Sequence, residues 1–304
     1  MTKTDDQRQR WRSYSALAAP AMFAIDTLLS NRVASLPPAT GWRPPCSIDC
    51  AWQARKPAAT ISRILRRLAL REGMMSNVIC GQGRLGGRVT ALLAARQLPL
   101  IPLRLDRDAG LINPAGPVPA DIDRLLICLV PRHPDGGSGW TGLLNGLQRQ
   151  LERGELRLRQ VLLVSSTAVY ESYEHGWVTA SSPVTAASAR SAGLIEAEQT
   201  ARALTADSCI VRLAGITGPG YERYDPVAMS QQQPRHAIDV RAAAALIAEL
   251  ALRPAQAART ELITDGYIYF RQQRYPAQPS LPELATLAQQ HRLMRPSLSA
   301  PELS

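Results

Sequence analysis

The order of apolar and polar positions in the middle of the chain predicts alternating strands and helices. The short apolar run Asn77–Cys80 is followed by a glycine-rich stretch and then by a segment with Val89 and Leu93 on one helical face. A second apolar run, Leu98–Leu105, follows at the distance expected of a strand–helix–strand unit. The pattern therefore predicts a parallel sheet with helices packed against it.

The following part of the chain continues this alternation but leaves out one strand. Asp108–Asp121 is a connection containing Pro and Gly that is too short for a helix and a further strand. Apolar runs at Leu125–Val130 and Gln160–Ser166 predict buried parallel strands, and Trp140–Leu151 between them predicts a helix. We therefore expect a Rossmann-type, doubly wound α/β sheet in which the third strand is reduced or lost.

The glycine-rich stretch between the first strand and the first helix fits the pattern G-x-G-x-x-G. Its residues are Gly81, Gln82, Gly83, Arg84, Leu85 and Gly86. Glycines at these positions let the backbone turn tightly and approach a pyrophosphate, which binds where the free N–H groups of the helix N-terminus point. The context of strand, loop and helix predicts a binding site for NAD or NADP.

Charged residues at the end of the second predicted strand bear on the choice between these two cofactors. Asp106 lies 20 residues beyond Gly86, where an acid would bind the 2′-hydroxyl of NAD. Arg104 and Arg107 flank it, and an arginine there would bind the 2′-phosphate of NADP. Two cations against one acid slightly favour NADP and leave NAD open.

Four parts of the chain are expected from these patterns. Residues 1–75 have weak periodicity and scattered prolines, which predicts a poorly structured extension, or a segment that is not native if the protein starts at Met75. Residues 76–215 are the predicted dinucleotide-binding domain, and residues 216–292 a small α+β substrate lobe. Residues 293–304 are rich in Ser and Pro and predict a disordered tail.

Composition excludes several classes of function. The net charge is +10, but 12 of the 35 Lys and Arg residues and only 5 of the 25 acids lie in residues 1–75. The remainder is nearly balanced, so we expect no binding of nucleic acid. The sequence contains no run of 18 apolar residues, so we expect no membrane span. The scattered five Cys and four His have no metal-ligand spacing, and apolar surroundings for two of the Cys suit a reducing cytoplasm.

Three motifs in order resemble the extended short-chain dehydrogenases/reductases, the family of nucleoside-diphosphate-sugar epimerases, dehydratases and reductases. They are the glycine loop, SSTAVY at 165–170, and RLAGITGPG at 212–220, and the resemblance covers about residues 76–270. It implies hydride transfer with a small carbonyl, hydroxyl or sugar-nucleotide substrate. It also implies that Ser166 hydrogen-bonds the substrate oxygen that gains or loses a proton.

The chain departs from this family at its catalytic tyrosine and lysine. Counting back from Glu198 places Arg190 where the tyrosine is expected and Leu194 where the lysine is expected. The only lysines are Lys3 and Lys56. Arginine cannot replace the tyrosine as a proton shuttle, because its guanidinium does not release a proton in proteins. The resemblance is therefore to an atypical branch that lacks the usual relay.

Two interpretations stay open at this point. The first is an enzyme that uses another proton donor, with Tyr170, Tyr173 or His175 as candidates and Arg190 as an anchor for an anionic group of substrate or cofactor. The second is a non-catalytic dinucleotide-binding module, acting as a redox sensor or scaffolding subunit. Both imply a small-molecule ligand, and both are compatible with a homodimer.

Overall fold

The computed structural model describes residues 75–108, 111–129, 140–254 and 256–299. All of these belong to one compact unit, which spans Lys56–Ser304. Residues 1–74 of the predicted extension lie outside the described residues. The prediction that they are poorly structured or not native therefore stays a prediction.

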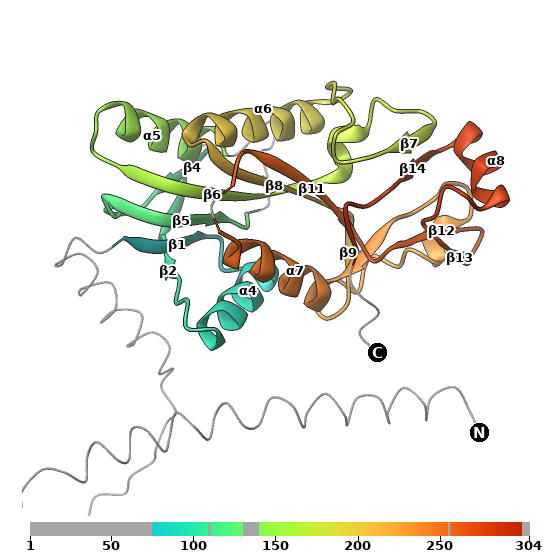
Figure 1. Ribbon diagram of the computed structural model, residues 1–304, viewed down its shortest axis with the longest axis horizontal. Helices are drawn as coiled ribbons and strands as arrows, with labels where there is room; N and C mark the ends of the chain where they lie inside the picture. Colours follow the sequence, from blue (N-terminus) through green and yellow to red (C-terminus); the bar gives the residue numbers. More distant parts are fainter. Residues whose placement is uncertain (1–74, 109–110, 130–139, 255, 300–304) are drawn as a thin grey trace, which may run out of the picture. The chain divides into compact units, whose positions relative to one another are not determined.

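A seven-stranded parallel sheet forms the centre of the molecule, in the order β15-β11-β8-β6-β5-β1-β2 (Figure 1). Its strands are β1 (Ser76–Cys80), β2 (Ile101–Pro102), β5 (Asp121–Ile127), β6 (Arg157–Ser166), β8 (Asp207–Leu213), β11 (Arg259–Thr264) and β15 (Leu298–Ser299). The predicted strands after the glycine loop are present, although β2 is only two residues long. The Rossmann-type fold class is confirmed by this strand order.

The third strand of the doubly wound arrangement is missing at the β2 edge, as predicted. The chain instead forms a short antiparallel hairpin of β3 (Leu105–Asp108) and β4 (Leu111–Pro114). It then enters β5 beside β1, on the side away from β2. Within the described residues the sheet therefore ends at β2.

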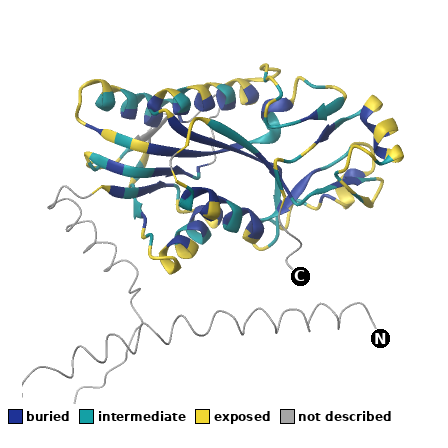
Figure 2. Cartoon of the chain, viewed as in Figure 1, coloured by how far each residue is buried: buried dark blue, intermediate teal, exposed yellow. Residues whose placement is uncertain are grey.

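Two pairs of helices cover opposite faces of the sheet, with α5 and α6 above it and α4 and α7 below it in Figure 1. Their bounds are α4 (Arg84–Ala95), α5 (Thr141–Glu152), α6 (Ala189–Leu204) and α7 (Val240–Leu252). Successive strand residues point to opposite faces, so Leu162 packs towards α4 and α7, and Leu163 towards α5 and α6. In Figure 2 the buried residues, in dark blue, follow the strands and the faces of the helices that are turned towards the sheet.

Smaller elements extend the molecule beyond the carboxyl ends of the strands. They are η1 (Thr167–Tyr170), β7 (Gly176–Val178), β9 (Gly215–Thr217), η2 (Ala228–Ser230), β10 (Ala237–Asp239), β12 (Tyr267–Phe270), β13 (Gln273–Pro276), α8 (Pro282–Gln290) and β14 (Arg292–Met294). A separate small core of Ile268, Leu284 and Leu293 holds α8, β12 and β14 together. Most of these elements come from residues 216–292, and the role of that range as a substrate lobe stays a prediction.

The C-terminal boundaries differ from those predicted. Residues 216–292 are not all lobe, because α7 and β11 lie in the helical layer and the central sheet. The predicted disordered tail is wrong for residues 293–299. Leu293 and Met294 are buried in β14, and Leu298 pairs with Ile263 of β11. The apolar pair Leu293–Met294 and the single Leu298 are enough to add strands where a neighbouring strand already offers backbone partners.

Candidate functional site

The glycine loop has a different geometric reason for each of its three glycines. Gly81 has φ +96°, a left-handed conformation that favours glycine, and a Cβ there would lie 2.6 Å from the carbonyl oxygen of Cys128. Gly83 is the N-cap of α4, and a Cβ there would meet no atom within 4 Å. A Cβ on Gly86 would lie 1.9 Å from the carbonyl oxygen of Gly81. The loop therefore combines a tight turn at Gly81, open space at Gly83 and a close helix–strand contact at Gly86.

This geometry fits a dinucleotide at the N-terminus of α4. Gln82, Gly83 and Arg84 are exposed, while Leu85 and Gly86 are buried and fix the first helical turn against the sheet. The first backbone N–H groups of a helix have no partner within it and carry a partial positive charge, which suits a pyrophosphate. The six predicted residues of the loop therefore lie together as the motif requires.

A segment from the far part of the chain packs against this helix N-terminus. The side chain of Arg84 lies against Gly220, where a Cβ would come within 2.6 Å of it, and its guanidinium lies 5.8 Å from the ring centre of Tyr221. Arg88 donates a hydrogen bond to the carbonyl oxygen of Pro219. Arg84 and Arg88 thus join the glycine loop to the GITGPG motif that the sequence resemblance singled out.

The residues predicted to read the cofactor ribose lie beyond β2. Arg104 and Asp106 are both exposed; Arg104 directly precedes β3, and Asp106 lies within it. Asp106 is in register with Asn113 across this hairpin. The side chain of Arg107 lies outside the described residues. Arg104 and Asp106 thus both lie beyond β2, the edge strand of the sheet, and the choice between NAD and NADP stays open.

The thiols beneath the loop are not candidates for nucleophilic chemistry. Cys80 is buried at the end of β1, and Cys128 follows β5 and donates its backbone N–H to the carbonyl oxygen of Cys80. Burial raises the pKa of the Cys128 thiol to about 12, and that of Cys80 is raised as well. Both therefore stay protonated and act as small apolar side chains under the loop.

Ser166 lies where β6 ends, at the carboxyl edge of the sheet. It is half-buried, and its hydroxyl accepts a hydrogen bond from the backbone N–H of Ala168 as the N-cap of η1. The adjacent strand β8 ends at the same level, with Leu213 in register with Ser166. The Ser166 O–H has no acceptor among the described residues, which is compatible with the predicted contact to a substrate oxygen.

Tyr170 is a buried structural residue, and the structure does not support its predicted role as a proton donor. Its side chain is inaccessible to solvent, and its hydroxyl donates to the carbonyl oxygen of Thr179 (2.7 Å) and accepts from Nη1 of Arg212 (2.8 Å). Arg212 also forms an ion pair with Glu198 (2.7 Å), which in turn accepts from the Ser165 hydroxyl (2.6 Å). Burial raises the pKa of the Tyr170 phenol, although Arg212 acts in the opposite direction. We call these four side chains the tyrosine–arginine network.

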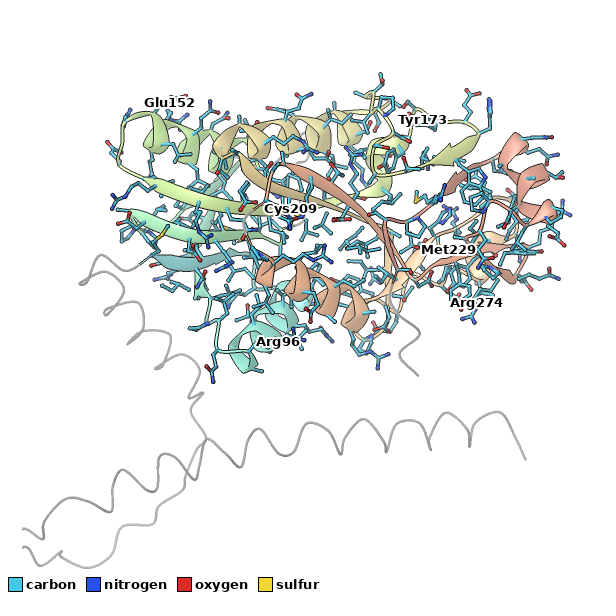
Figure 3. All side chains as sticks on the ribbon, viewed as in Figure 1. Arg96, Glu152, Tyr173, Cys209, Met229 and Arg274 are labelled. Carbon is cyan, nitrogen blue, oxygen red and sulfur yellow. The ribbon has the colours of Figure 1, made fainter. Side chains whose placement is uncertain are left out.

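The other predicted site residues lie further from the strand ends. Tyr173, labelled in Figure 3, is half-buried and donates to the carbonyl oxygen of Pro183. His175 is exposed in the same loop, and Arg190 is exposed in the first turn of α6. Leu194, where the family has its lysine, is buried in the core of the sheet. The positions of the family's tyrosine and lysine are therefore held by an exposed arginine and a buried leucine.

One buried histidine at this edge was missed by sequence reasoning. His236 directly precedes β10 and is only 6% exposed, and neither of its ring nitrogens has a hydrogen-bond partner among the described residues. Burial and the positive charge of Arg292 lower the pKa of this imidazole to about 3, so it is neutral at physiological pH. Nothing in the local sequence pattern separates this histidine from an exposed one.

Backbone contacts place His236 beside the ends of β6 and β8. Its carbonyl oxygen accepts from the backbone N–H of Gly215 (3.2 Å), just beyond β8, and from the hydroxyl of Tyr224 (3.0 Å). The Tyr224 ring lies against Gly215, where a Cβ would come within 2.3 Å of it. Arg292 donates to the carbonyl oxygen of Tyr170 in the turn that follows Ser166. Ser166, His236 and Arg292 therefore border the same edge of the sheet.

Comparisons with known proteins give a likeness at the level of solved structures. No family model matches the chain, and no curated protein matches it. A conserved protein of unknown function from Silicibacter pomeroyi is 20% identical, with 73% of this chain and 90% of that chain covered and a TM-score of 0.49.

Two further structures of this kind contain NAD. The Bordetella bronchiseptica enzyme WbmH in complex with NAD+ is 14% identical over 66% of this chain and 79% of that one, with a TM-score of 0.49. A short-chain dehydrogenase/reductase superfamily protein from Agrobacterium tumefaciens with bound NAD is 15% identical over 72% and 85%, with a TM-score of 0.47. At this level of similarity the fold of the present chain is argued from its own strand order and glycine loop.

No helix in the described part of the chain is long and apolar enough to cross a membrane. No group of three or more His, Cys, Asp or Glu side chains in the same ranges has the arrangement of a metal site.

Proposed function

We propose that this chain binds NAD or NADP and acts as an oxidoreductase or epimerase-like enzyme of the extended short-chain dehydrogenase/reductase kind. Its substrate is a small carbonyl or hydroxyl compound or a sugar nucleotide, and it works without a tyrosine–lysine relay. The single observation that carries the proposal is the loop Gly81–Gly86. There a forced turn, an open position and a close contact stand in the order that a bound pyrophosphate requires.

The residues present fit the cofactor. The backbone N–H groups at Gly83–Leu85 hold its pyrophosphate at the start of α4, and Arg104 or Asp106 contacts its ribose. The nicotinamide ring supplies hydride transfer when it is bound. NADP is favoured slightly, because Arg104 is exposed and Arg107 is nearby in sequence. Titration with NADH and NADPH, followed by nicotinamide fluorescence, decides between the two cofactors.

Ser166 is the proposed contact to the reacting oxygen of the substrate. Its position at the end of β6 supports this role, as does an O–H that has no acceptor in the described part of the chain. Arg190 is proposed to anchor an anionic group of substrate or cofactor, which its exposed place in the first turn of α6 allows. Tyr170 has no proposed role as a proton donor, because its hydroxyl already donates to Thr179 and accepts from Arg212.

The loop is tested by Gly83→Val. A branched side chain at the open position would occupy the space needed by the pyrophosphate, so affinity for NADH should fall at least about tenfold, or ~1.4 kcal/mol. Gly116→Val is the matched control, because this exposed loop glycine also has no atom within 4 Å of a Cβ. Both variants should melt as the wild type does. An unchanged NADH affinity in Gly83→Val would remove the loop as the cofactor site.

A non-catalytic dinucleotide-binding module is the second candidate function. It is favoured by the exposed Arg190 and the buried Leu194, which leave no relay at the family's catalytic positions. The two functions are separated by turnover. Tight cofactor binding with no reaction towards any carbonyl or sugar-nucleotide substrate would establish the module. A Ser166→Ala variant that loses activity would establish the enzyme.

The proposal also covers the cellular compartment and the partners of the protein. Cys80, Cys128 and Cys209 are free thiols in the described part of the chain, which supports a reducing compartment such as the cytoplasm. A small-molecule substrate is the proposed partner, and a homodimer is compatible with the fold.

A further inference from the structure

Two of the buried polar groups at the carboxyl edge of the sheet differ in whether the protein itself satisfies them. The Glu198 carboxylate accepts hydrogen bonds from Ser165 and Arg212, so its charge is fully paired. The His236 imidazole is as inaccessible as that carboxylate, yet neither Nδ1 nor Nε2 is bonded within the described residues. A buried polar group without a partner costs about 1–3 kcal/mol. An imidazole held this way is therefore a candidate for binding a ligand.

We propose that the His236 imidazole, beside the guanidinium of Arg292, forms a hydrogen bond to a hydroxyl or carbonyl oxygen of the substrate. This inference rests on the proposed function, because it places the substrate next to Ser166. It adds a binding residue that the three sequence motifs do not contain.

The surrounding contacts fix the imidazole close to the Ser166 turn. On one side, the His236 carbonyl oxygen is bonded to Gly215, two residues beyond the position of β8 that is in register with Ser166. On the other side, Arg292 acts electrostatically on the ring and donates to the carbonyl oxygen of Tyr170, four residues after Ser166. These contacts place the His236 backbone at the end of β8 and its ring within electrostatic reach of the arginine that contacts the serine's turn.

The protonation state suits a hydrogen-bonding role better than an acid or base role. A pKa of about 3 leaves the imidazole neutral, with one N–H donor and one nitrogen acceptor. Such a ring is a weak base, so it does not take up the substrate proton at neutral pH. A neutral N–H donor can instead hold and polarise a carbonyl oxygen, and the second nitrogen can accept from a hydroxyl.

A first experiment measures stability, which requires no knowledge of the substrate. In His236→Leu, an apolar side chain of similar size replaces the unpartnered ring, so we expect the melting temperature of the full chain to rise by about 2–4 °C. His291→Leu is the control, since that half-buried ring packs against Phe270 and leucine preserves an apolar contact. Its melting temperature should stay within about 1 °C of the wild type. A fall of several degrees in His236→Leu would show that the ring is a structural residue and would overturn the proposal.

A second experiment measures binding to the protein saturated with NADH, with UDP-glucose as the probe. We expect affinity for UDP-glucose to fall at least about tenfold in His236→Leu, which corresponds to ~1.4 kcal/mol, the size of a lost hydrogen bond. NADH affinity should be unchanged in both histidine variants. Equal UDP-glucose affinity in His236→Leu and wild type, or no binding to either, would overturn this assignment. Failure of the proposed function would appear separately, as loss of NADH binding by the wild type or as unchanged binding in Gly83→Val.

Discussion

Two polar clusters flank the turn after Ser166, and they differ in how completely the protein satisfies them. In the tyrosine–arginine network every charge and hydroxyl has a partner, and the side chains are almost fully buried. Beside it, the His236 imidazole is equally buried but unpartnered among the described residues. The contrast shows that burial of a titratable group does not identify a site. The decisive property is whether the fold leaves its hydrogen-bonding capacity unused.

The largest effect is expected from breaking the paired cluster at Arg212. Arg212→Leu leaves the Glu198 carboxylate buried without its cation, and we expect the free energy of unfolding to fall by about 3–5 kcal/mol. Urea denaturation followed by circular dichroism measures this loss. The double variant Glu198→Leu with Arg212→Leu removes both charges and should recover a large part of it. A single variant as stable as the wild type would contradict the structural role of the network.

A smaller effect is expected from Tyr170→Phe, which tests the corrected role of this residue. The substitution keeps the ring but removes the hydroxyl that bonds Thr179 and Arg212, so the expected loss is about 1–3 kcal/mol of unfolding free energy. NADH affinity and any turnover should stay within about twofold of the wild type. Loss of turnover at unchanged stability would instead make Tyr170 a proton donor after all.

The smallest effect on stability is expected from Arg190→Ala. Arg190 is exposed, so the unfolding free energy should change by no more than about 0.5 kcal/mol. If this residue anchors an anionic group, affinity for NADPH or UDP-glucose falls while the melting curve does not move. Unchanged affinity for both would leave Ser166 and the glycine loop without this third contact.

The geometry of the candidate cofactor loop could be predicted from sequence because it is local. The glycine loop lies within six residues, and each glycine meets its own requirement in a turn between adjacent elements. Ser166 could likewise be placed by the end of an apolar strand. The lost third strand followed from the length of Asp108–Asp121 alone.

The remainder of the site depends on contacts between distant parts of the chain, which periodicity does not encode. Tyr170 looked like a candidate acid by its spacing from Ser166, but its role is set by Arg212 in another strand. His236 is 70 residues from Ser166, and its burial depends on the strands and loops packed around it. The strands at 292–299 were missed because their few apolar residues gain order only against partners already in place.

The pairing of β14 with β7 also determines the order in which the site can be assembled during synthesis. Arg292 reaches Tyr170 across 122 positions of sequence, whereas Gly81 and Gly86 meet within a single turn. Protein chains emerge from the ribosome N-terminal end first, and contacts between distant residues form late. A nascent chain can therefore complete its glycine loop well before Arg292 has been made. The newly synthesised protein would form its glycine loop first and the environment of His236 last.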